Sequence, residues 1–547
     1  MTLESQTESV AAGDRMLSDL DAATAVSDWQ TAYTIANRAL SKGLRHPRFF
    51  MVRAHRMEHG GHLQFALEDY QRAAALAPDD IRILETLANC AMKMKGYRIA
   101  VDAYDSIVAL DPGRAQAFYR RGVALAHLGD SEGAQRSHEQ AIEADPQCAD
   151  ALASLSSIMV RKGDLEKARL YSERALAANS DQATAAVSLG QAHMAERRYA
   201  DAEKQFADVL ASGTVQPTNR AQVLTLLGDA LDGQKKYAEA FAAYTTANAE
   251  LRRLHAEEQS GSAAESARSL IGYFENESPS RWKTTDDGGK VEGAFDQHVF
   301  LLGFMRSGTT LLEQVLATSP NIAALEEKGL LIAAGEEYLT SLPALEKFAT
   351  LDHGTLTELR QQYWKRVRDH LPGSTAKVFV DKQPLNTTKL PLIAKLFPNA
   401  RILFALRDPR DVVFSCFRRN FRVTGTQFEF LTTETCARIY SLIMRIGELS
   451  REKFDLNVLE HRYEDMVEDF DGRVRAVCEF VGVEWSDAMR RFNEHASVAD
   501  LRSPSALQVR RPLYGDGIGQ WRRYREQLKP VLPILEPWVE KFGYPRD

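Results

Sequence analysis

The sequence predicts two architectures in one chain: an all-α solenoid, followed by an α/β domain built on a parallel sheet. Three observations support this prediction. Prolines recur at 34-residue intervals in the first half, apolar strands alternate with helical segments in the second half, and a glycine-bounded loop joins the first of these strands to a helix. A chain of 547 residues also exceeds one typical domain of about 150 residues. We therefore expect a multidomain protein.

The first half has the spacing of tetratricopeptide (TPR) repeats. Pro78, Pro112 and Pro146 each follow a helical pattern and lie 34 residues apart. A small residue recurs in phase with them, at Ala66, Ala100, Ala134, Ala168 and Ala202. Such units are helix–turn–helix pairs that stack because none can bury its apolar face alone, and small residues let the two helices cross closely. We expect about six or seven repeats over residues 13–255.

The pattern changes twice beyond these units. A last unit, shifted by a few residues, contains Gly228 and Tyr244, and the chain then becomes polar and rich in Gly, Ser and Asp. We interpret residues 256–295 as a linker with a short helix around Ser266–Glu275. Short apolar runs such as HVFLL, KVFVD and RILFAL then alternate with helical segments, which predicts a parallel sheet with crossover helices in a domain spanning residues 296–547.

Composition and charge exclude several classes of protein. Lys plus Arg number 68 against 75 for Asp plus Glu, and this net charge of −7 gives no basic excess for binding nucleic acid. No apolar run reaches about 18 residues, so no membrane span is expected. The N-terminus lacks the basic and apolar segments of a signal peptide. The five cysteines are scattered without a CxxC pair, so we expect a cytoplasmic, reducing location and no zinc site.

The first predicted strand of the second domain ends in a candidate anion-binding loop. The segment GFMRSGTT runs from Gly303 directly into a helix, whose N-terminal N–H groups and dipole would face a ligand. The spacing is that of a nucleoside-triphosphate loop, but Thr309 occupies the position of the lysine, which disfavours a kinase or ATPase. The candidate ligand-binding residues are Arg306, Ser307, Gly308, Thr309 and Thr310.

This loop, continued as GFMRSGTTLLEQVLATSPNI, resembles the 5′-phosphosulfate loop of sulfotransferases that use 3′-phosphoadenylyl sulfate (PAPS). The resemblance is to the tyrosylprotein sulfotransferase branch and to bacterial sulfotransferases with TPR repeats. It implies that Arg407 and Ser415 of RDPRDVVFS bind the 3′-phosphate, with Arg419 one helical turn further on. It also implies that Tyr463 of HRYED lies near the nucleotide.

A segment near the C-terminus resembles the loop that closes over PAPS in this family. Ser505 matches a serine assigned to the transition state, and Trp521 is a candidate cofactor contact. Gln520 departs from the pattern, because the family often has Lys or Arg at this position. Arg522 and Arg523 are the neighbouring cations available to compensate.

Sulfuryl transfer needs a base for the acceptor proton and cations for the developing charge. The family resemblance implies Glu327 as the base, with Glu326 as the alternative one residue away. It implies Arg306 and Lys382 as the cations that stabilise the leaving group. No metal is expected, since the 13 histidines form no convincing cluster with cysteines or carboxylates.

The acceptor and the role of the repeats are less sharply defined by the sequence. TPR grooves suit peptides, so the leading hypothesis is a protein or peptide tyrosine that the repeats select; carbohydrates, lipids and small alcohols remain alternatives. A second hypothesis is a TPR scaffold with an inactive, nucleotide-sensing domain, for which Gln520 is the supporting observation. The sequence defines no oligomeric state.

Overall fold

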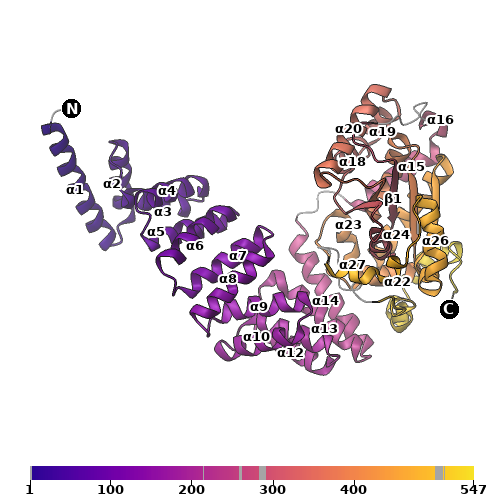
Figure 1. Ribbon diagram of the computed structural model, residues 1–547, viewed down its shortest axis with the longest axis horizontal. Coiled ribbons are helices and arrows are strands. Elements are labelled where there is room, and N and C mark those ends of the chain that lie inside the picture. Colours follow the sequence, from indigo (N-terminus) through magenta and orange to yellow (C-terminus); the bar gives the residue numbers. More distant parts are fainter. Residues whose placement is uncertain are drawn as a thin grey trace. The chain divides into compact units, whose positions relative to one another are not determined.

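The computed structural model describes residues 3–213, 215–257, 262–282, 291–498, 509 and 512–546. These residues form two compact units, Met1–Val215 and Gln216–Asp547. Figure 1 shows helices throughout the first unit and the sheet within the second. No helix in the described part of the chain combines the length and the apolar character that crossing a bilayer requires.

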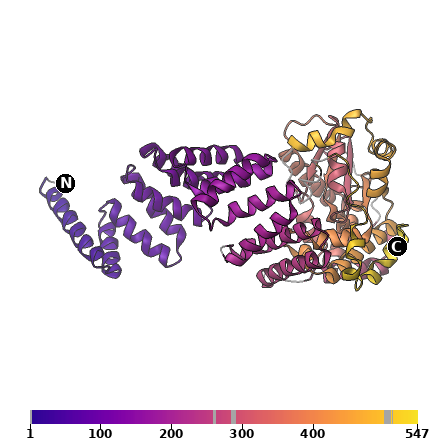
Figure 2. The same ribbon diagram turned by 90° about the horizontal axis from the view of Figure 1, so that it is seen from below.

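The first unit consists of antiparallel helix pairs that follow one another in sequence order (Figure 2). The five alanines that recur every 34 residues are 0–1% exposed, as expected where two helices cross closely. Gly190 serves the same purpose, because a Cβ atom there would lie 2.5 Å from the ring of Phe206. The predicted helical solenoid is confirmed. Its helices are α1 (Leu3–Ala25), α2 (Trp29–Ser41), α3 (Pro47–His59), α4 (Leu63–Leu76), α5 (Ile81–Lys93), α6 (Tyr97–Leu110), α7 (Ala115–His127), α8 (Ser131–Ala144), α9 (Ala149–Lys162), α10 (Leu165–Ala178), α11 (Ala183–Ala195) and α12 (Tyr199–Ser212).

The second unit begins with one more helix pair, α13 (Pro217–Gly233) and α14 (Tyr237–His255). We counted this hairpin with the repeats from its sequence, but its packing joins it to the α/β domain. The segment interpreted as a linker contains α15 (Ala263–Asn276), longer than the short helix predicted there, and α16 (Pro279–Trp282). The packing boundary at residues 215/216 therefore precedes the boundary drawn from the repeat pattern by one hairpin.

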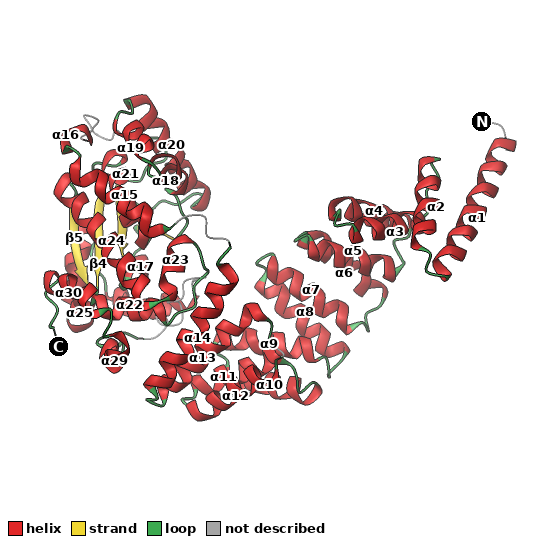
Figure 3. Cartoon of the chain, turned by 180° about the vertical axis from the view of Figure 1, so that it is seen from behind, coloured by secondary structure: helices red, strands yellow, loops and turns green. Residues whose placement is uncertain are grey.

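A five-stranded parallel sheet forms the centre of the second unit, in the order β2-β3-β1-β4-β5. This confirms the predicted parallel sheet with crossover helices, and Figure 3 shows helices around its strands. The chain leaves β1 toward β2 and leaves β4 toward β5, so the direction of the connections reverses between β1 and β4. Ligands of open α/β sheets bind beyond the carboxyl ends of the strands at such a point. The strands are β1 (Gln297–Gly303), β2 (Ile322–Glu326), β3 (Val378–Lys382), β4 (Arg401–Leu406) and β5 (Asn457–Arg462).

The two faces of the sheet pack against different helices. Val299 and Leu301 of β1 belong to one apolar cluster, together with residues of α17 and α26, whereas Phe300 and Leu302 belong to the other, which includes α15, α20 and α24. This alternation is the period-2 pattern of a strand covered on both sides. The helices after the hairpin and α16 are α17 (Thr309–Ala317), α18 (Ile332–Tyr338), α19 (Leu342–Ala349), α20 (His353–His370), α21 (Leu390–Leu396), α22 (Pro409–Phe417), α23 (Gly425–Phe428), α24 (Thr433–Lys453), α25 (Tyr463–Glu468), α26 (Phe470–Val481), α27 (Phe492–Val498), α29 (Arg525–Leu528) and α30 (Leu532–Lys541), with 3-10 turns η1 (Pro384–Lys389), η2 (Glu429–Leu431), η3 (Asp487–Arg491) and η4 (Gln520–Tyr524).

The helix crossing at Gly190 gives a stability prediction. Gly190→Ala should destabilise the protein by about 1–3 kcal/mol, because the added methyl group has no space beside Phe206. Gly13→Ala, in helix α1, is the control, since its Cβ would meet Leu44 at an ordinary 3.7 Å. Urea unfolding followed by circular dichroism measures both variants. Equal unfolding midpoints of Gly190→Ala and the parent protein would show that the helix crossing tolerates the methyl group.

Candidate active site

The loop between β1 and α17 is held in a conformation that depends on its glycines. Gly303 has φ 144°, and a Cβ atom there would lie 2.4 Å from the carbonyl oxygen of Ala405 on β4. Gly308 has φ 89°, and its Cβ would lie 2.8 Å from the ring of Tyr463. Arg306, between them, has φ 67°, which is uncommon for a residue with a side chain. Backbone strain of this kind clusters at ligand-binding sites.

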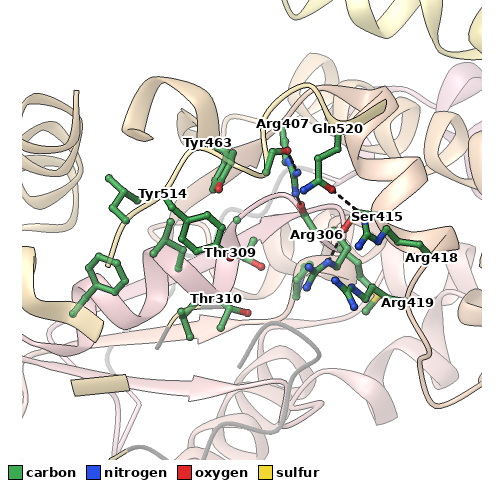
Figure 4. Close-up of a pocket in the computed structure, with 18 of the residues that line it drawn as sticks. Arg306, Thr309, Thr310, Arg407, Ser415, Arg418, Arg419, Tyr463, Tyr514 and Gln520 are labelled. Carbon is green, nitrogen blue, oxygen red and sulfur yellow. Dashed lines mark hydrogen bonds between the residues drawn. The ribbon is translucent and has the colours of Figure 1, made fainter. Parts of the chain in front are cut away.

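This loop borders a pocket at the carboxyl ends of β1 and β4, where the strand order predicts a site. Its apolar wall includes Met305, Leu311, Pro384, Phe421, Phe492, Val509, Pro512 and Leu513. The pocket is also lined by nine residues that the sequence analysis selected for the site, namely Arg306, Gly308, Thr309, Thr310, Glu327, Arg407, Ser415, Arg419 and Tyr463. Figure 4 shows most of these side chains around the pocket. The structure thus brings together residues that are up to 157 positions apart in the chain.

Arginines dominate one side of the pocket. Arg306 donates from Nε to Oγ of Ser415 at 3.0 Å, and Arg407 donates to the backbone carbonyl of Arg306 at 2.9 Å. The guanidinium of Arg407 also stacks 5.0 Å from the ring centroid of Tyr463. Burial, together with repulsion from Arg419 and Arg407, lowers the pKa of Arg306 to about 9. Burial and the neighbouring arginines make the charged form of Arg306 unfavourable, so a bound anion would stabilise it.

Two buried N–H groups of this cluster lack an acceptor within the described residues. They are Nε of Arg407 and Nε of Arg418, and both residues line the pocket. Buried donors are nearly always paired, so these two groups are available to an acceptor that the described residues do not supply. Arg418 was missed by the sequence analysis, although it stands next to Arg419. The donor set fits the phosphate groups of a nucleotide.

The other charged residues of the RDPRD segment are not among the described lining residues, and two of them contact the segment around Trp521. Asp411 accepts from the backbone N–H groups of Gly519 at 2.6 Å and Trp521 at 2.8 Å, and its burial raises its pKa to about 6. Arg410 lies 4.0 Å from the ring centroid of Trp521, which is 1% exposed. The structure therefore places Trp521 beneath the site and not among the described lining residues.

Gln520, the departure from the family pattern, does line the pocket. Its Oε1 accepts from Arg418 at 3.4 Å (Figure 4). Arg522 and Arg523, the cations expected to compensate for it, are exposed and lie outside the described lining. Arg418 is thus the guanidinium that contacts residue 520.

The acidic side of the pocket is built around one buried lysine. Nζ of Lys382 lies 2.9 Å from Glu326, 3.1 Å from Glu327 and 3.5 Å from Glu313. Burial alone would lower the pKa of Lys382, but the three carboxylates outweigh it and raise the pKa. Lys382 is fully buried and is not itself among the described lining residues. It contacts Glu327, which lines the pocket, whereas Glu326 is not among the described lining residues.

Glu327 has a backbone conformation that turns it away from the end of β2. Its φ is 50°, and its N–H donates to the carbonyl of Lys382 at 2.9 Å. Glu326, the last residue of β2, pairs in register with Lys382 on β3. Glu313, in the apolar stripe of α17, is 3% exposed and was not selected from the sequence; a single acid within TLLEQVL is the signal that could have found it.

Two of the residues selected from the sequence are the serines Ser505 and Ser307. Ser505 lies outside the described residues. Ser307 is 3% exposed, within the loop, and is not among the described lining residues. Within the part of the chain that the structure describes, no group of three or more His, Cys, Asp or Glu side chains is arranged to hold a metal ion.

Comparison with known proteins agrees with this fold. Residues 298–487 match the sulfotransferase family, and residues 85–135, 128–184 and 187–251 match the tetratricopeptide repeat. The chain therefore carries a sulfotransferase domain joined to TPR repeats, as its sequence resemblance implies. The last of these repeat matches covers the α13–α14 hairpin that packs with the sulfotransferase domain.

Individual relatives share modest identity with the chain. An uncharacterised protein of Aquifex aeolicus is 26% identical over 365 residues, which is 65% of this chain and 46% of that protein. Protein-tyrosine sulfotransferase 1 of Danio rerio is 23% identical over 45% of this chain and 72% of its own. Protein-tyrosine sulfotransferase A of Caenorhabditis elegans is 22% identical over 53% of this chain and 76% of its own. The chain thus spans about half the length of the first relative.

The buried Glu313 gives a pH-dependent prediction. Burial raises its pKa to about 7 from an ordinary value of 4.5, so the folded chain keeps a proton that the unfolded chain loses earlier. Stability therefore falls as the pH rises through this window. Glu313→Gln removes the titration, and its stability relative to the parent should rise by about 1 kcal/mol or more between about pH 5 and about pH 8.

Urea unfolding at the two pH values measures this difference. Glu358→Gln, an exposed glutamate on α20, is the control and should show no such change. A Glu313→Gln variant whose relative stability is independent of pH would show that this carboxyl titrates normally in the folded chain.

Proposed function

We propose that this chain transfers a sulfuryl group from PAPS to an acceptor hydroxyl. One observation carries the proposal: one pocket joins two arginines, whose Nε–H groups have no acceptor among the described residues, to a glutamate that touches a buried lysine. The first set suits the phosphates of the donor, and the second suits proton removal from an acceptor. The sulfotransferase match over residues 298–487 supports the same activity.

The donor would be bound through the arginine side of the pocket. The N-terminal N–H groups of α17, with Arg306, Thr309 and Thr310, would face the 5′-phosphosulfate. Arg407, Ser415 and Arg419 would hold the 3′-phosphate, as the family resemblance implies. Tyr463, half-buried and already stacked on Arg407, would lie beside the nucleotide.

The transfer step is a displacement at sulfur. The acceptor oxygen forms a bond to sulfur as the bond between sulfur and the bridging phosphate oxygen breaks, and adenosine 3′,5′-bisphosphate leaves. Glu327 takes the proton of the acceptor hydroxyl. Lys382 holds Glu327 in place, and both Lys382 and Arg306 supply positive charge for the negative charge that develops on the leaving group.

A protein or peptide tyrosine is the acceptor that we propose, with the TPR repeats selecting it. The named relatives in Danio rerio and Caenorhabditis elegans support a tyrosine. The repeat array supports a protein partner, because stacked repeats present an extended surface for peptides. The apolar wall of the pocket, which includes Phe421 and Phe492, suits an aromatic ring.

Donor binding depends on the guanidinium of Arg407. Arg407→Met should weaken the binding of adenosine 3′,5′-bisphosphate by roughly 10- to 100-fold, because charge-assisted hydrogen bonds are worth about 1.5–3 kcal/mol each. Arg523→Met, at an exposed position outside the pocket lining, is the matched control. Isothermal titration calorimetry measures both. Equal affinities of the two variants would remove Arg407 from the donor site.

Transfer itself depends on Glu327. Glu327→Gln should slow transfer from labelled PAPS to tyrosine-containing proteins by roughly 100-fold or more, while binding of adenosine 3′,5′-bisphosphate is kept. Glu326→Gln, its neighbour, should change the rate by less than about tenfold. A reversed order of the two variants would make Glu326 the base. Nucleotide binding by the parent chain without transfer to any tyrosine, carbohydrate or alcohol acceptor would favour the scaffold hypothesis.

A further inference from the structure

The α13–α14 hairpin carries a carboxylate that reaches the arginines of the pocket. Oδ1 of Asp229 accepts from Arg418 at 2.9 Å and from the hydroxyl of Tyr244 at 2.8 Å, and Oδ2 accepts from Arg419 at 2.9 Å. The side chain of Asp229 is 14% exposed, and that of Arg418 is 9% exposed. One buried carboxylate therefore bridges two neighbouring guanidinium groups and uses both of its oxygens.

The electrostatics of the site make this bridge important. Four arginines meet at the pocket, at positions 306, 407, 418 and 419. Burial by itself raises the pKa of Asp229, but Arg419 and Arg418 outweigh it, so the pKa lies below its ordinary value. Asp232, one helical turn further along α13, lies 3.8 Å from Arg418 and accepts from the hydroxyl of Tyr524. The hairpin thus supplies the counter-charge of the two arginines that follow α22.

The hairpin is fixed to the helix that precedes these arginines. Nδ2 of Asn248 donates to the carbonyl of Phe417 at 2.8 Å, in a buried contact. The ring of Phe241 stacks on Phe417 with centroids 5.0 Å apart, and Tyr237 meets Tyr524 edge-on at 5.4 Å. These contacts of α14 fix the hairpin against the end of α22 and against η4, and so fix the place where Asp229 of α13 meets the two guanidinium groups.

We infer that Asp229 is a positioning residue of the donor site, and that the last TPR hairpin is a working part of the sulfotransferase domain. The inference rests on the proposed function, because it assigns Arg419 to the 3′-phosphate of the donor. Because its carboxylate accepts hydrogen bonds from Arg418 and Arg419, Asp229 fixes the direction in which their remaining N–H groups point. The selectivity of the pocket for a phosphate at one position of the ribose then depends on a residue of the repeat array.

Asp229→Asn tests this role with almost no change in shape. Asn offers one oxygen and one NH₂ group, so it must turn a donor toward one of the two guanidinium groups and release it. The variant also makes the pocket more positive, which alters the affinity for every phosphate alike. A ratio of affinities separates these effects: adenosine 3′,5′-bisphosphate and its 2′,5′ isomer carry the same charge at neighbouring ribose positions.

The measurement is calorimetric binding of both isomers to the full chain. The parent should prefer the 3′,5′ isomer, and Asp229→Asn should lower that preference by roughly tenfold, the order of effect found when a partner that orients a ligand-binding group is removed. Glu239→Gln, an exposed acid on α14, removes the same charge from the same hairpin and should keep the preference. Lower thermal stability with an unchanged preference would overturn the inference.

Two further outcomes separate this inference from the proposed function. A parent chain that binds neither isomer contradicts the proposed function and the inference with it, whereas a selective parent and an equally selective Asp229→Asn contradict the inference alone. If Asp229→Asn does not fold, Tyr244→Phe removes one donor to the same carboxylate and should lower the preference in the same direction. An unchanged preference in Tyr244→Phe would then overturn the inference.

Discussion

The repulsion between buried guanidinium groups at the ends of β1 and β4 is the constraint on which the site depends. Like charges in a dry pocket repel strongly, and every contact around them reduces that cost. A serine hydroxyl faces Arg306, a backbone carbonyl and an aromatic ring face Arg407, and Asp229 faces the remaining pair. The Nε–H groups of Arg407 and Arg418 have no acceptor among the described residues, and a bound anion would supply one.

A second group of carboxylates lies around Lys382, apart from the arginine cluster and its partner Asp229. Three glutamates share this one ammonium group, so the acidic side has excess negative charge when they are ionised. The pocket is therefore polarised from one end to the other. In the reaction that we propose, the arginine end attracts the anionic donor, while a neutral hydroxyl can approach the carboxylate of Glu327.

Sequence reasoning found what local patterns encode. The repeat spacing is a regular recurrence along the chain, and the strand–loop–helix segment around Arg306 and the helix start after Arg407 are each contained in a few consecutive residues. Each of these elements lies where its pattern predicts. Asp229 was missed because its partner Arg418 is 189 residues away, and no local pattern pairs them. Trp521 was selected by its motif, but Arg410 and Asp411 hold it beneath the pocket. Glu313 was missed because its partner Lys382 is distant in the sequence, on β3, and no local pattern pairs them.

The α13–α14 hairpin matches the TPR repeat and also packs with the sulfotransferase domain. This combination affects how the protein can evolve. Helices before residue 216 supply none of the described pocket residues, so repeats there can be duplicated, lost or re-surfaced while the chemistry is retained. The hairpin has no such freedom, since a shift of one turn in α13 would carry Asp229 away from two arginines. The last repeat is thus tied to the sulfotransferase domain by its packing, whereas the upstream repeats are not.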